Sequence, residues 1–348
     1  MKITKIVLTG GPGSGKTTMI EALKSNLKEK GYKVIVVNET ARELAEEGIA
    51  LGGSYDYVLH LQELVLKRQL HKERDIEDFA KNSCLKDVVI LYDRGVLDNK
   101  AYLKLNDDFK YMLIKNNEKE IKICDKYNLV IDLKSAANLG YEFYRNDEIR
   151  GERLEDALNL DYKTTNAWAL APNLKIINPT VKMGEKEEKV IKLVNDYLNG
   201  EMEMTYNKEQ IEDKSIDLNN ILENGAVSVV FCTNYYIDSK KDNIKYIVSK
   251  RIYDESESLV LKKLREENGK TYLMECSSIG KEEFRKLRME NRVIKTEVVA
   301  EITFLNEEGK LITIQKDKDD LYIIYDKNDY KLDDEKDIKT KIKKLKVS

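Results

Sequence analysis

Short, mostly apolar runs alternate with helical patterns over the first 200 residues of the chain. The runs span residues 6–9, 34–37, 88–92, 129–131 and 174–177. After the first run, apolar side chains recur at helical spacing, at Ile20, Leu23 and Leu27, and Gly31 predicts the helix end. Further helices are expected over residues 40–47, 55–79 and 185–198. Strands that alternate with helices indicate an α/β fold, a doubly wound parallel sheet with helices on both faces.

The pattern changes after residue 200. Residues 201–223 are polar and acidic, which favours a linker. Residues 224–335 contain short apolar strands and turns such as Asn268-Gly269, with one helix predicted over residues 281–290. These features predict a mostly antiparallel, β-rich α+β domain. The lysine-rich residues 336–348 are expected to form a solvated tail.

Composition limits the functional class only in part. A length of 348 residues favours two domains, and a net charge of −3 gives no strong signal for a nucleic-acid partner or a membrane surface. No apolar run approaches the ~20 residues that cross a bilayer, and no secretory segment is evident, so a cytoplasmic location is the default expectation. The four cysteines and two histidines are scattered, without the clustering of a zinc site.

The strongest motif is G-x-x-x-x-G-K-[ST], which follows the first predicted strand and opens the first predicted helix. Its residues, with the one that follows, are Gly10, Gly11, Pro12, Gly13, Ser14, Gly15, Lys16, Thr17 and Thr18. Glycines let backbone N–H groups turn toward phosphate oxygens, and the helix N-terminus adds its positive dipole end. Lys16 is expected to reach the β- and γ-phosphates, and Thr17 to offer its hydroxyl to Mg²⁺. The motif therefore predicts a nucleoside-triphosphate site that uses Mg²⁺ with ATP, or with GTP.

Acidic residues end two of the predicted strands. Asp93 follows the run 88–92, and Glu39 follows the run 34–37 by one residue. Because the carboxyl ends of parallel strands form the ligand-binding edge of such a sheet, Asp93 is expected to hold Mg²⁺ or to accept a proton from an attacking hydroxyl. Glu39 is a second candidate near the phosphate acceptor, with helix capping as its alternative role. Arg94 is expected to position an anionic or polar acceptor.

Arginines gather between the fourth and fifth predicted strands, at Arg145, Arg150 and Arg153. On a mobile segment they could close over the nucleotide and neutralise charge on the transferred phosphoryl group. The alternative is a solvated helix with charge pairs three or four residues apart. The sequence does not choose between the three; Arg150 represents them among the candidate catalytic residues. The single tryptophan, Trp168, is expected in the core.

Together these motifs resemble the ATPase family related to ribosylnicotinamide kinases, which are P-loop kinases rather than ring-forming machines. The residues that carry the resemblance are Gly10 to Thr18, Asn38-Glu39-Thr40-Ala41-Arg42-Glu43, Tyr92-Asp93-Arg94-Gly95-Val96-Leu97-Asp98, Arg150-Gly151-Glu152, Asp156-Ala157 and Asp161. The resemblance covers residues 1–200. It implies a five-stranded core with Lys16 and Thr17 at the phosphates, Asp93 at the metal or acceptor, and Glu39 near the acceptor.

The C-terminal half more faintly resembles CYTH-like, or triphosphate-tunnel, domains. The similarity lies in residues 261–265, Gly269, Tyr272, Glu283-Phe284 and residues 293–296. The acidic Glu-x-Glu-x-Lys triad of those domains is missing, since residues 227–232 contain no charged side chain, so catalytic metal chemistry is not expected there. Basic residues remain, and strand alternation would send about half of them to one face, where a phosphate-bearing ligand could bind, or a solvated surface could lie. They are Lys250, Arg251, Lys262, Lys263 and Arg265.

These observations predict an ATP-binding P-loop NTPase, and most specifically an ATP- and Mg²⁺-dependent phosphotransferase that acts on a small hydroxyl acceptor such as a nucleoside or nucleotide. The alternative is a regulatory switch that responds to ATP or GTP and whose C-terminal domain binds an anionic ligand or partner. The guanine motif Asn-Lys-x-Asp is absent after the fourth predicted strand, which reads Ile131-Asp132-Leu133-Lys134.

Overall fold

The structure is a computed structural model that describes residues 2–83, 86–140, 153–182, 184–211, 228–239, 243–305, 311–318 and 320–326. Two compact units make up the chain, Met1–Asn195 and Asp196–Ser348. Among the helices described, none is both long enough and apolar enough to span a membrane. The expected tail over residues 336–348 lies outside the described residues.

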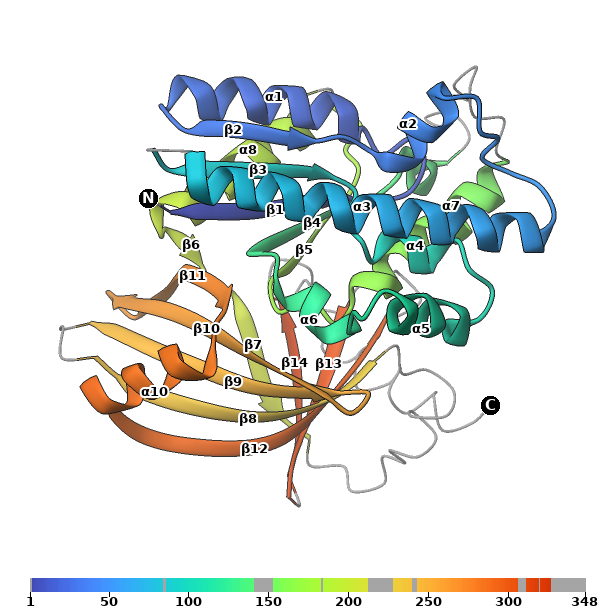
Figure 1. Ribbon diagram of the computed structural model, residues 1–348. Coiled ribbons are helices and arrows are strands. Elements are labelled where there is room, and N and C mark those ends of the chain that lie inside the picture. The colour runs from blue at the N-terminus through green and yellow to red at the C-terminus, as the bar shows by residue number, and fades with distance from the viewer. Residues whose placement is uncertain are drawn as a thin grey trace. The chain divides into compact units, whose positions relative to one another are not determined.

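A parallel sheet of five strands, in the order β2-β3-β1-β4-β5, forms the centre of the first unit (Figure 1). The strands are β1 (Ile3–Thr9), β2 (Lys33–Val37), β3 (Val88–Asp93), β4 (Leu129–Leu133) and β5 (Leu174–Ile177). Val7 of the central strand β1 lies opposite Tyr92 of β3 on one side and Val130 of β4 on the other. The predicted doubly wound parallel sheet is confirmed.

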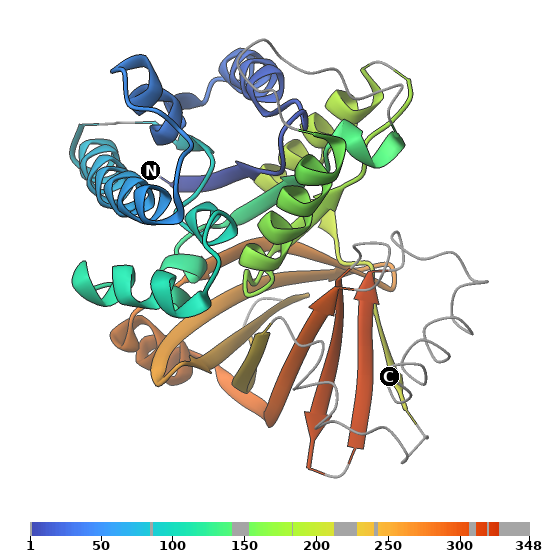
Figure 2. The ribbon, with the colours of Figure 1, turned by 90° about the vertical axis from the view of Figure 1, so that its right-hand side faces the viewer.

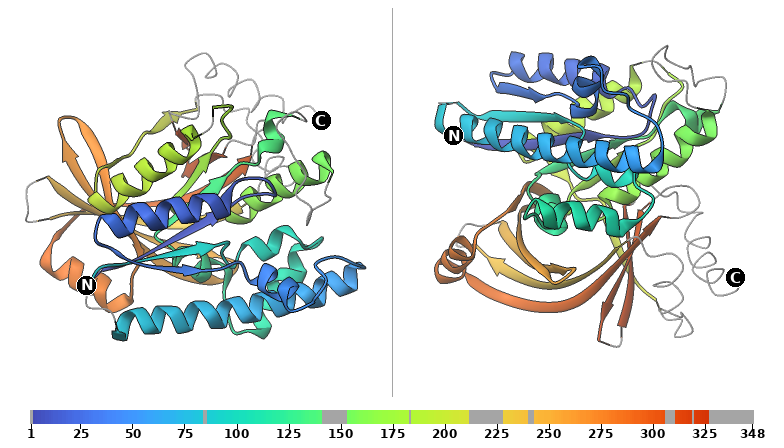
Figure 3. Two further views of the ribbon diagram at one scale, coloured as in Figure 1. Left: turned by 90° about the horizontal axis from the view of Figure 1, so that it is seen from above. Right: turned by 45° about the vertical axis from the view of Figure 1, so that its right-hand side comes forward.

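Helices cover both faces of this sheet. They are α1 (Lys16–Glu29), α2 (Thr40–Glu46), α3 (Tyr55–Ser83), α4 (Asp98–Ala101), α5 (Asn106–Lys115), α6 (Glu120–Asp125), the 3₁₀ helix η1 (Ala136–Leu139), α7 (Leu154–Trp168) and α8 (Glu185–Asn199). From β1 through α1 to β2 and from β2 through α3 to β3 the chain moves in opposite directions along the sheet, so the usual right-handed crossover puts α1 and α3 on opposite faces. Figure 2 shows them there in dark and lighter blue. The N-terminal half of α3 extends beyond the carboxyl ends of β2 and β3 (Figure 3).

The core of the first unit is the centre of the sheet. Ile6, Val7 and Leu8 of β1 are fully buried, as the apolar run predicted. Trp168, at the end of α7, is also fully buried, and its ring meets Tyr127 edge-on with 5.5 Å between centroids. Burial of side chains of this size stabilises a fold by about 1.5–3 kcal/mol each. The core position expected for Trp168 is confirmed.

The second unit is a nine-stranded sheet in the order β6-β11-β10-β9-β8-β12-β13-β14-β7, and every recorded strand pair in it is antiparallel. The strands are β6 (Met202–Glu203), β7 (Tyr206–Gln210), β8 (Ser228–Asp238), β9 (Ile244–Tyr253), β10 (Ser256–Glu267), β11 (Lys270–Ser278), β12 (Arg292–Leu305), β13 (Leu311–Asp317) and β14 (Asp320–Asp326). The helix α10 (Lys281–Glu290) packs Phe284 against a cluster that includes Ile237, Val248 and Leu261. A separate antiparallel sheet follows the P-loop-type unit, as predicted.

Residues 202–210, which were expected to fall within a linker, instead form the two edge strands of this sheet. β6 pairs with β11 at one edge, and β7 pairs with β14 at the other. Two residues separate β6 from β7, and two residues of chain span at most ~11 Å between the flanking residues. The two edges of the sheet therefore approach each other at this point, and the sheet must be strongly curled. The other part of the expected linker, residues 212–223, lies outside the described residues.

The hairpin turn predicted at Asn268-Gly269 is confirmed. Both residues have positive φ, 51° and 76°, and Glu267 pairs with Lys270 across the turn. Asp254 and Glu255 form a second two-residue turn with φ of 47° and 58°. That turn begins with aspartate and has no glycine or asparagine, so its sequence signal is weaker than that of Asn-Gly.

Gly95 should not tolerate a side chain. A Cβ atom there would lie 2.5 Å from the buried ring of Trp168. We expect Gly95→Ala to lower the free energy of unfolding by about 1–3 kcal/mol, because the surrounding core must shift to avoid the overlap. Chemical denaturation measures this change. Gly52→Ala is the matched control, since nothing lies within 4 Å of its Cβ position; equal stability of the two variants would contradict the prediction.

Candidate functional site

The predicted phosphate-binding loop, residues 10–17, joins β1 to α1. Gly10, Gly13 and Gly15 have φ of 135°, 68° and 82°, a backbone region that side chains disfavour. At Gly10, a Cβ atom would also lie 2.1 Å from the carbonyl oxygen of Leu133. The N–H groups of residues 13–17 donate to no group within the described part of the chain. They are available to an anion at the N-terminus of α1.

Lys16 is folded back onto this loop. Its Nζ donates to the carbonyl oxygens of Gly10 and Gly11 at 2.9 and 3.0 Å, and to Ser14 Oγ at 3.0 Å. Burial, together with the neighbouring Arg94 charge, lowers the pKa of Lys16 to about 7. The side chain thus lies over the anion site and lacks a carboxylate partner at hydrogen-bond distance among the described residues. An incoming phosphate would supply the missing negative charge.

Arg94 joins the phosphate-binding loop to two carboxylates. It has a positive φ of 67°, unusual for a residue with a side chain, and it is 5% exposed. Its Nε donates to Glu39 Oε1 at 2.7 Å, and its Nη1 donates to Asp98 Oδ1 at 3.2 Å and to the carbonyl oxygen of Gly10 at 3.3 Å. Asp98 is held in turn by Thr9 Oγ1 at 2.5 Å and by Trp168 Nε1 at 3.2 Å.

Asp93 lies beside this cluster at the carboxyl end of β3. Burial, and then the nearby Glu39 carboxylate, raise the pKa of Asp93 above its ordinary value, while Lys16 opposes the shift. Its Oδ1 is buried and has no hydrogen-bond partner among the described residues. A buried carboxylate oxygen without a donor is a suitable ligand for a hard cation.

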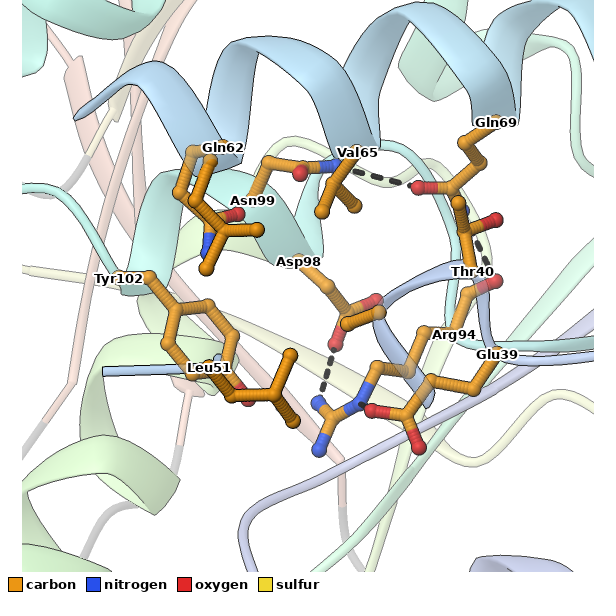
Figure 4. A pocket seen from close by; sticks show the side chains of 12 residues that line it. Glu39, Thr40, Leu51, Gln62, Val65, Gln69, Arg94, Asp98, Asn99 and Tyr102 are labelled. Atoms are coloured by element: carbon orange, nitrogen blue, oxygen red, sulfur yellow. Dashed lines mark hydrogen bonds and ion pairs between the residues drawn. The ribbon is translucent and has the colours of Figure 1, made fainter. Parts of the chain in front are cut away.

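A pocket opens next to Glu39 and Arg94 (Figure 4). Its empty space, which includes open solvent at the mouth, is about 610 Å³. It is lined by Glu39, Thr40, Ala41, Leu51, Leu61, Gln62, Val65, Gln69, Arg94, Asp98, Asn99 and Tyr102. Within the described structure, three buried polar atoms of this lining have no hydrogen-bond partner: Thr40 Oγ1, Arg94 Nη2 and Asn99 Oδ1. Since buried polar atoms are normally paired, these three are suited to bind a ligand.

The predicted site residues separate into two groups. Lys16, Glu39, Asp93 and Arg94 come together between the phosphate-binding loop and the pocket. Thr17 and Thr18 are exposed in the first turn of α1. Arg145 and Arg150 lie outside the described residues, and Arg153 is exposed directly before α7.

Several residues of the site had no role predicted from the sequence. Asp98 follows Arg94 by four residues, and that spacing was the one available signal for the ion pair. Gln69 and Asn99 hold each other through Asn99 Nδ2 at 3.1 Å, and Gln69 also donates to the carbonyl oxygen of Arg94 at 3.2 Å. Contacts between residues 30 positions apart leave no periodic trace in a sequence.

A second buried charge cluster lies on the other side of the phosphate-binding loop. Lys134 Nζ is 2.9 Å from Asp161 Oδ2 and 4.0 Å from Asp132 Oδ2. Thr165 Oγ1 donates to Asp132 Oδ2 at 2.5 Å, whereas Asp132 Oδ1 has no partner in the part of the chain described. Burial raises the pKa of Asp132 to about 6, with Lys134 opposing the shift and Asp161 adding to it.

The five basic residues predicted as a candidate ligand surface divide between the faces of the second unit's sheet. Strand pairing places Arg251 and Lys262 on one face, and Lys250, Lys263 and Arg265 on the other. The Arg251 face also carries Glu297, which accepts hydrogen bonds from Tyr236 Oη at 2.9 Å and Lys295 Nζ at 3.1 Å. This face carries both signs of charge.

A family model described as an AAA domain matches residues 5–186, more than half of the 348 residues. Among solved structures, the chain is similar to one titled "Structure of PH1819 protein from Pyrococcus Horikoshii OT3", with 13% sequence identity, a TM-score of 0.31, and coverage of 41% of this chain and 90% of that chain. Comparison with curated proteins gave no match. The family match includes the phosphate-binding loop, both charge clusters and the whole pocket.

Asp132 should make stability depend on pH. Its native pKa of about 6 lies above the ~3.9 of an unfolded chain, so the stability it contributes is present at low pH and lost as the pH rises through about 6. We expect Asp132→Asn to raise the thermal unfolding temperature at pH 8 and to match the wild type near pH 4. The exposed Asp156→Asn on α7 is the control. A difference that stays constant between pH 4 and pH 8 would show that ionisation of Asp132 is not the cause.

Proposed function

Because the chain belongs to this AAA-domain family, we propose that its P-loop NTPase domain is an ATP- and Mg²⁺-dependent phosphotransferase that acts on a small hydroxyl acceptor. The observation that carries the proposal is the position of Arg94. This side chain donates both to the Gly10 carbonyl of the phosphate-binding loop and to Glu39 of the pocket, at 3.3 and 2.7 Å. A phosphate donor on the loop and an acceptor in the pocket would therefore be neighbours, as transfer requires.

The triphosphate would bind at the N-terminus of α1. The unengaged N–H groups of residues 13–17 supply donors, and Lys16 supplies a positive charge to the β- and γ-phosphates. Lys16 is held only by carbonyl and hydroxyl oxygens in the described structure. A phosphate can therefore replace these weaker acceptors.

Mg²⁺ would be held by Thr17 and Asp93. The Thr17 hydroxyl is exposed at the start of α1, and Asp93 has a buried oxygen without a partner. Oxygen ligands of this kind suit Mg²⁺, which usually takes one or two protein groups and completes its shell with phosphate and water. When bound, the ion neutralises charge on the transferring phosphoryl group. No group of three or more His, Cys, Asp or Glu residues suited to a metal occurs among the described residues, which favours a site shared with nucleotide.

Glu39 is the preferred base for the acceptor. It lines the pocket, whereas Asp93 is not part of the lining. Arg94 Nε fixes one carboxylate oxygen of Glu39 at 2.7 Å and orients the group. We therefore assign the acceptor's proton to Glu39 and the metal to Asp93, with Arg94 as the residue that positions Glu39.

The pocket favours an uncharged acceptor. Its charged lining residues are Glu39, Asp98 and Arg94, and Arg94 already pairs with both carboxylates. Arg94 Nη2 is still able to donate to a ligand, but one guanidinium faces two carboxylates, so a phosphorylated acceptor would meet a net negative lining. Asn99 Oδ1, Thr40 Oγ1 and the apolar Leu61 instead suit a compound with hydroxyl groups and a flat or apolar part, such as a nucleoside. The motif resemblance to ATPases related to ribosylnicotinamide kinases supports the same acceptor class.

Lys16→Ala should abolish most nucleotide binding while the chain stays folded. The lysine provides a point charge to the phosphates, and its loss is expected to weaken the affinity for ATP at least ~10-fold. Isothermal titration with ATP, with and without Mg²⁺, measures the change. Lys24→Ala, on the same helix and paired with Glu21, is the matched control. Unchanged affinity and turnover in Lys16→Ala would overturn the nucleotide site.

Glu39→Gln and Asp93→Asn should both lower turnover by at least ~100-fold, the usual scale for a positioned base or metal-orienting group, while the affinity for ATP stays within a few-fold of wild type.

Turnover is measured as ADP release with nucleosides and with nucleoside monophosphates as acceptors. Nucleosides are expected to accelerate ADP release, and monophosphates are not. Asp93→Asn should also raise the Mg²⁺ concentration needed for half-maximal rate, and Glu39→Gln should not. The exposed Glu46→Gln on α2 is the control.

Two outcomes would contradict these assignments. ADP release that no hydroxyl compound accelerates would favour the regulatory switch over the phosphotransferase. Full turnover in Glu39→Gln, with loss in Asp93→Asn, would transfer the role of base to Asp93.

A further inference from the structure

The carbonyl groups of the phosphate-binding loop all have partners in the first unit. The carbonyls of Gly10 and Gly11 accept from Lys16 Nζ, and the Gly10 carbonyl also accepts from Arg94 Nη1. The Ser135 hydroxyl donates to the Pro12 carbonyl, and the Ala136 N–H donates to the Gly13 carbonyl at 3.3 Å. Lys186 Nζ donates to the Ser14 carbonyl at 2.9 Å, and the Met19 N–H donates to the Gly15 carbonyl at 3.0 Å. In a trans peptide the N–H points opposite to the carbonyl. The donors to the Pro12, Gly13 and Ser14 carbonyls come from outside the loop, and the N–H groups of the residues that follow each of them therefore point the opposite way, toward the phosphate site.

The Gly11 N–H is an exception, because it donates to the Asp161 carboxylate. Asp161 lies on α7, 1% exposed, and its Oδ1 accepts from the N–H of Gly11 and from the N–H of Ser135, each at 3.0 Å. The contact is close: a Cβ atom on Gly11 would lie 2.7 Å from the Cβ of Asp161. Only glycine at position 11 allows α7 to approach the loop in this way.

The second oxygen of Asp161 holds the turn after β4. Oδ2 accepts from Asn138 Nδ2 at 3.0 Å and lies 2.9 Å from Lys134 Nζ. The same turn supplies Ser135 and Ala136, the donors to the Pro12 and Gly13 carbonyls. One carboxylate thus connects α7, the phosphate-binding loop and the turn that orients two of its peptides.

Lys134 makes this arrangement compatible with an anionic ligand. An unpaired carboxylate next to the loop would repel phosphate. The Lys134 side chain is 7% exposed and pairs with Asp161, so the pair adds little net charge. Lys186 Nζ fixes the Lys134 carbonyl at 2.8 Å as well as the Ser14 carbonyl, and this ties the turn to the loop a second time.

We propose that Asp161 is a positioning residue of the nucleotide site: it sets the peptide orientations of the phosphate-binding loop through Gly11 and Ser135 without touching the nucleotide. The inference rests on the proposed nucleotide site and adds a residue whose role neither the motif nor the pocket assigns. It predicts that Asp161 acts on nucleotide affinity through the backbone acceptor Oδ1, separately from the stability supplied by its ion pair with Lys134.

Asp161→Asn and Asp161→Ala separate these two contributions. Both lose the ion pair with Lys134 and should lower the thermal unfolding temperature, Asp161→Ala by more, because it also leaves the Gly11 and Ser135 N–H groups without an acceptor. Asparagine keeps an oxygen that can accept from Gly11 and Ser135, and alanine does not. We expect ATP affinity within about 3-fold of wild type for Asp161→Asn and at least ~10-fold weaker for Asp161→Ala, the loss that two hydrogen bonds of ordinary strength correspond to.

Titration calorimetry with Mg²⁺-ATP and steady-state turnover measure the effect. In Asp161→Ala the KM for ATP should rise while kcat at saturating ATP stays within a few-fold. Asp156→Ala, exposed on the same helix, is the matched control and should change neither. Equal ATP affinities of the two Asp161 variants would overturn the proposal and leave Asp161 a purely structural residue.

Ser135→Ala keeps the test decisive if Asp161→Ala does not fold. It removes the hydroxyl that donates to the Pro12 carbonyl and that caps η1 by accepting from the Ala137 N–H, so it should weaken ATP binding about 5-fold and also lower the thermal unfolding temperature. Wild-type affinity in Ser135→Ala would overturn the proposed route through the turn. Lys16→Ala distinguishes failure of this inference from failure of the nucleotide site, because it must lose ATP binding whatever Asp161 does.

Discussion

Arg94 places a positive charge in the interior of the first unit, and the geometry of the candidate site depends on how that charge is compensated. Burying a guanidinium costs several kcal/mol unless carboxylates and hydrogen bonds surround it. Glu39, Asp98 and the Gly10 carbonyl meet this requirement, and they come from the end of β2, the start of α4 and the phosphate-binding loop. The ion pairs therefore fix three segments relative to one another, and the left-handed backbone of Arg94 is the strain that this position imposes.

The phosphate-binding loop is held from two sides with different chemistry. On the side of β3, Arg94 fixes the first peptide of the loop and connects it to the pocket. On the side of β4, Asp161 and Lys134 fix it through the N–H of Gly11 and the turn at Ser135. Both arrangements are buried, so solvent screening does not weaken them. A loop held in this way needs little rearrangement to receive an anion, which is the condition for electrostatic stabilisation of a transferring group.

The fold was predictable where local patterns determine it. Apolar runs buried on both faces indicated the parallel strands, and Asn268-Gly269 indicated a hairpin because both residues adopt positive φ readily. The edge strands β6 and β7 were missed, since polar edge residues such as those at 206–210 read as linker. Their strand structure comes from pairing with β11 and β14, partners more than 60 residues away. Such pairing satisfies backbone groups and leaves no side-chain signature.

For the site, the sequence by itself determined the backbone of the turn between β1 and α1, because the motif puts glycines at positions of positive φ, and it predicted phosphate binding there from the lysine at the helix start. It also indicated Asp93 and Glu39, since residues that end parallel strands meet at one edge of the sheet. Tertiary structure alone decided that Arg94 pairs with Glu39, that the pocket is bounded by α3 and α4, and that Asp161 reaches Gly11 from 150 residues away. Those relations depend on packing between segments distant in the chain, and the order of residues records the segments but not which side chains meet when they pack.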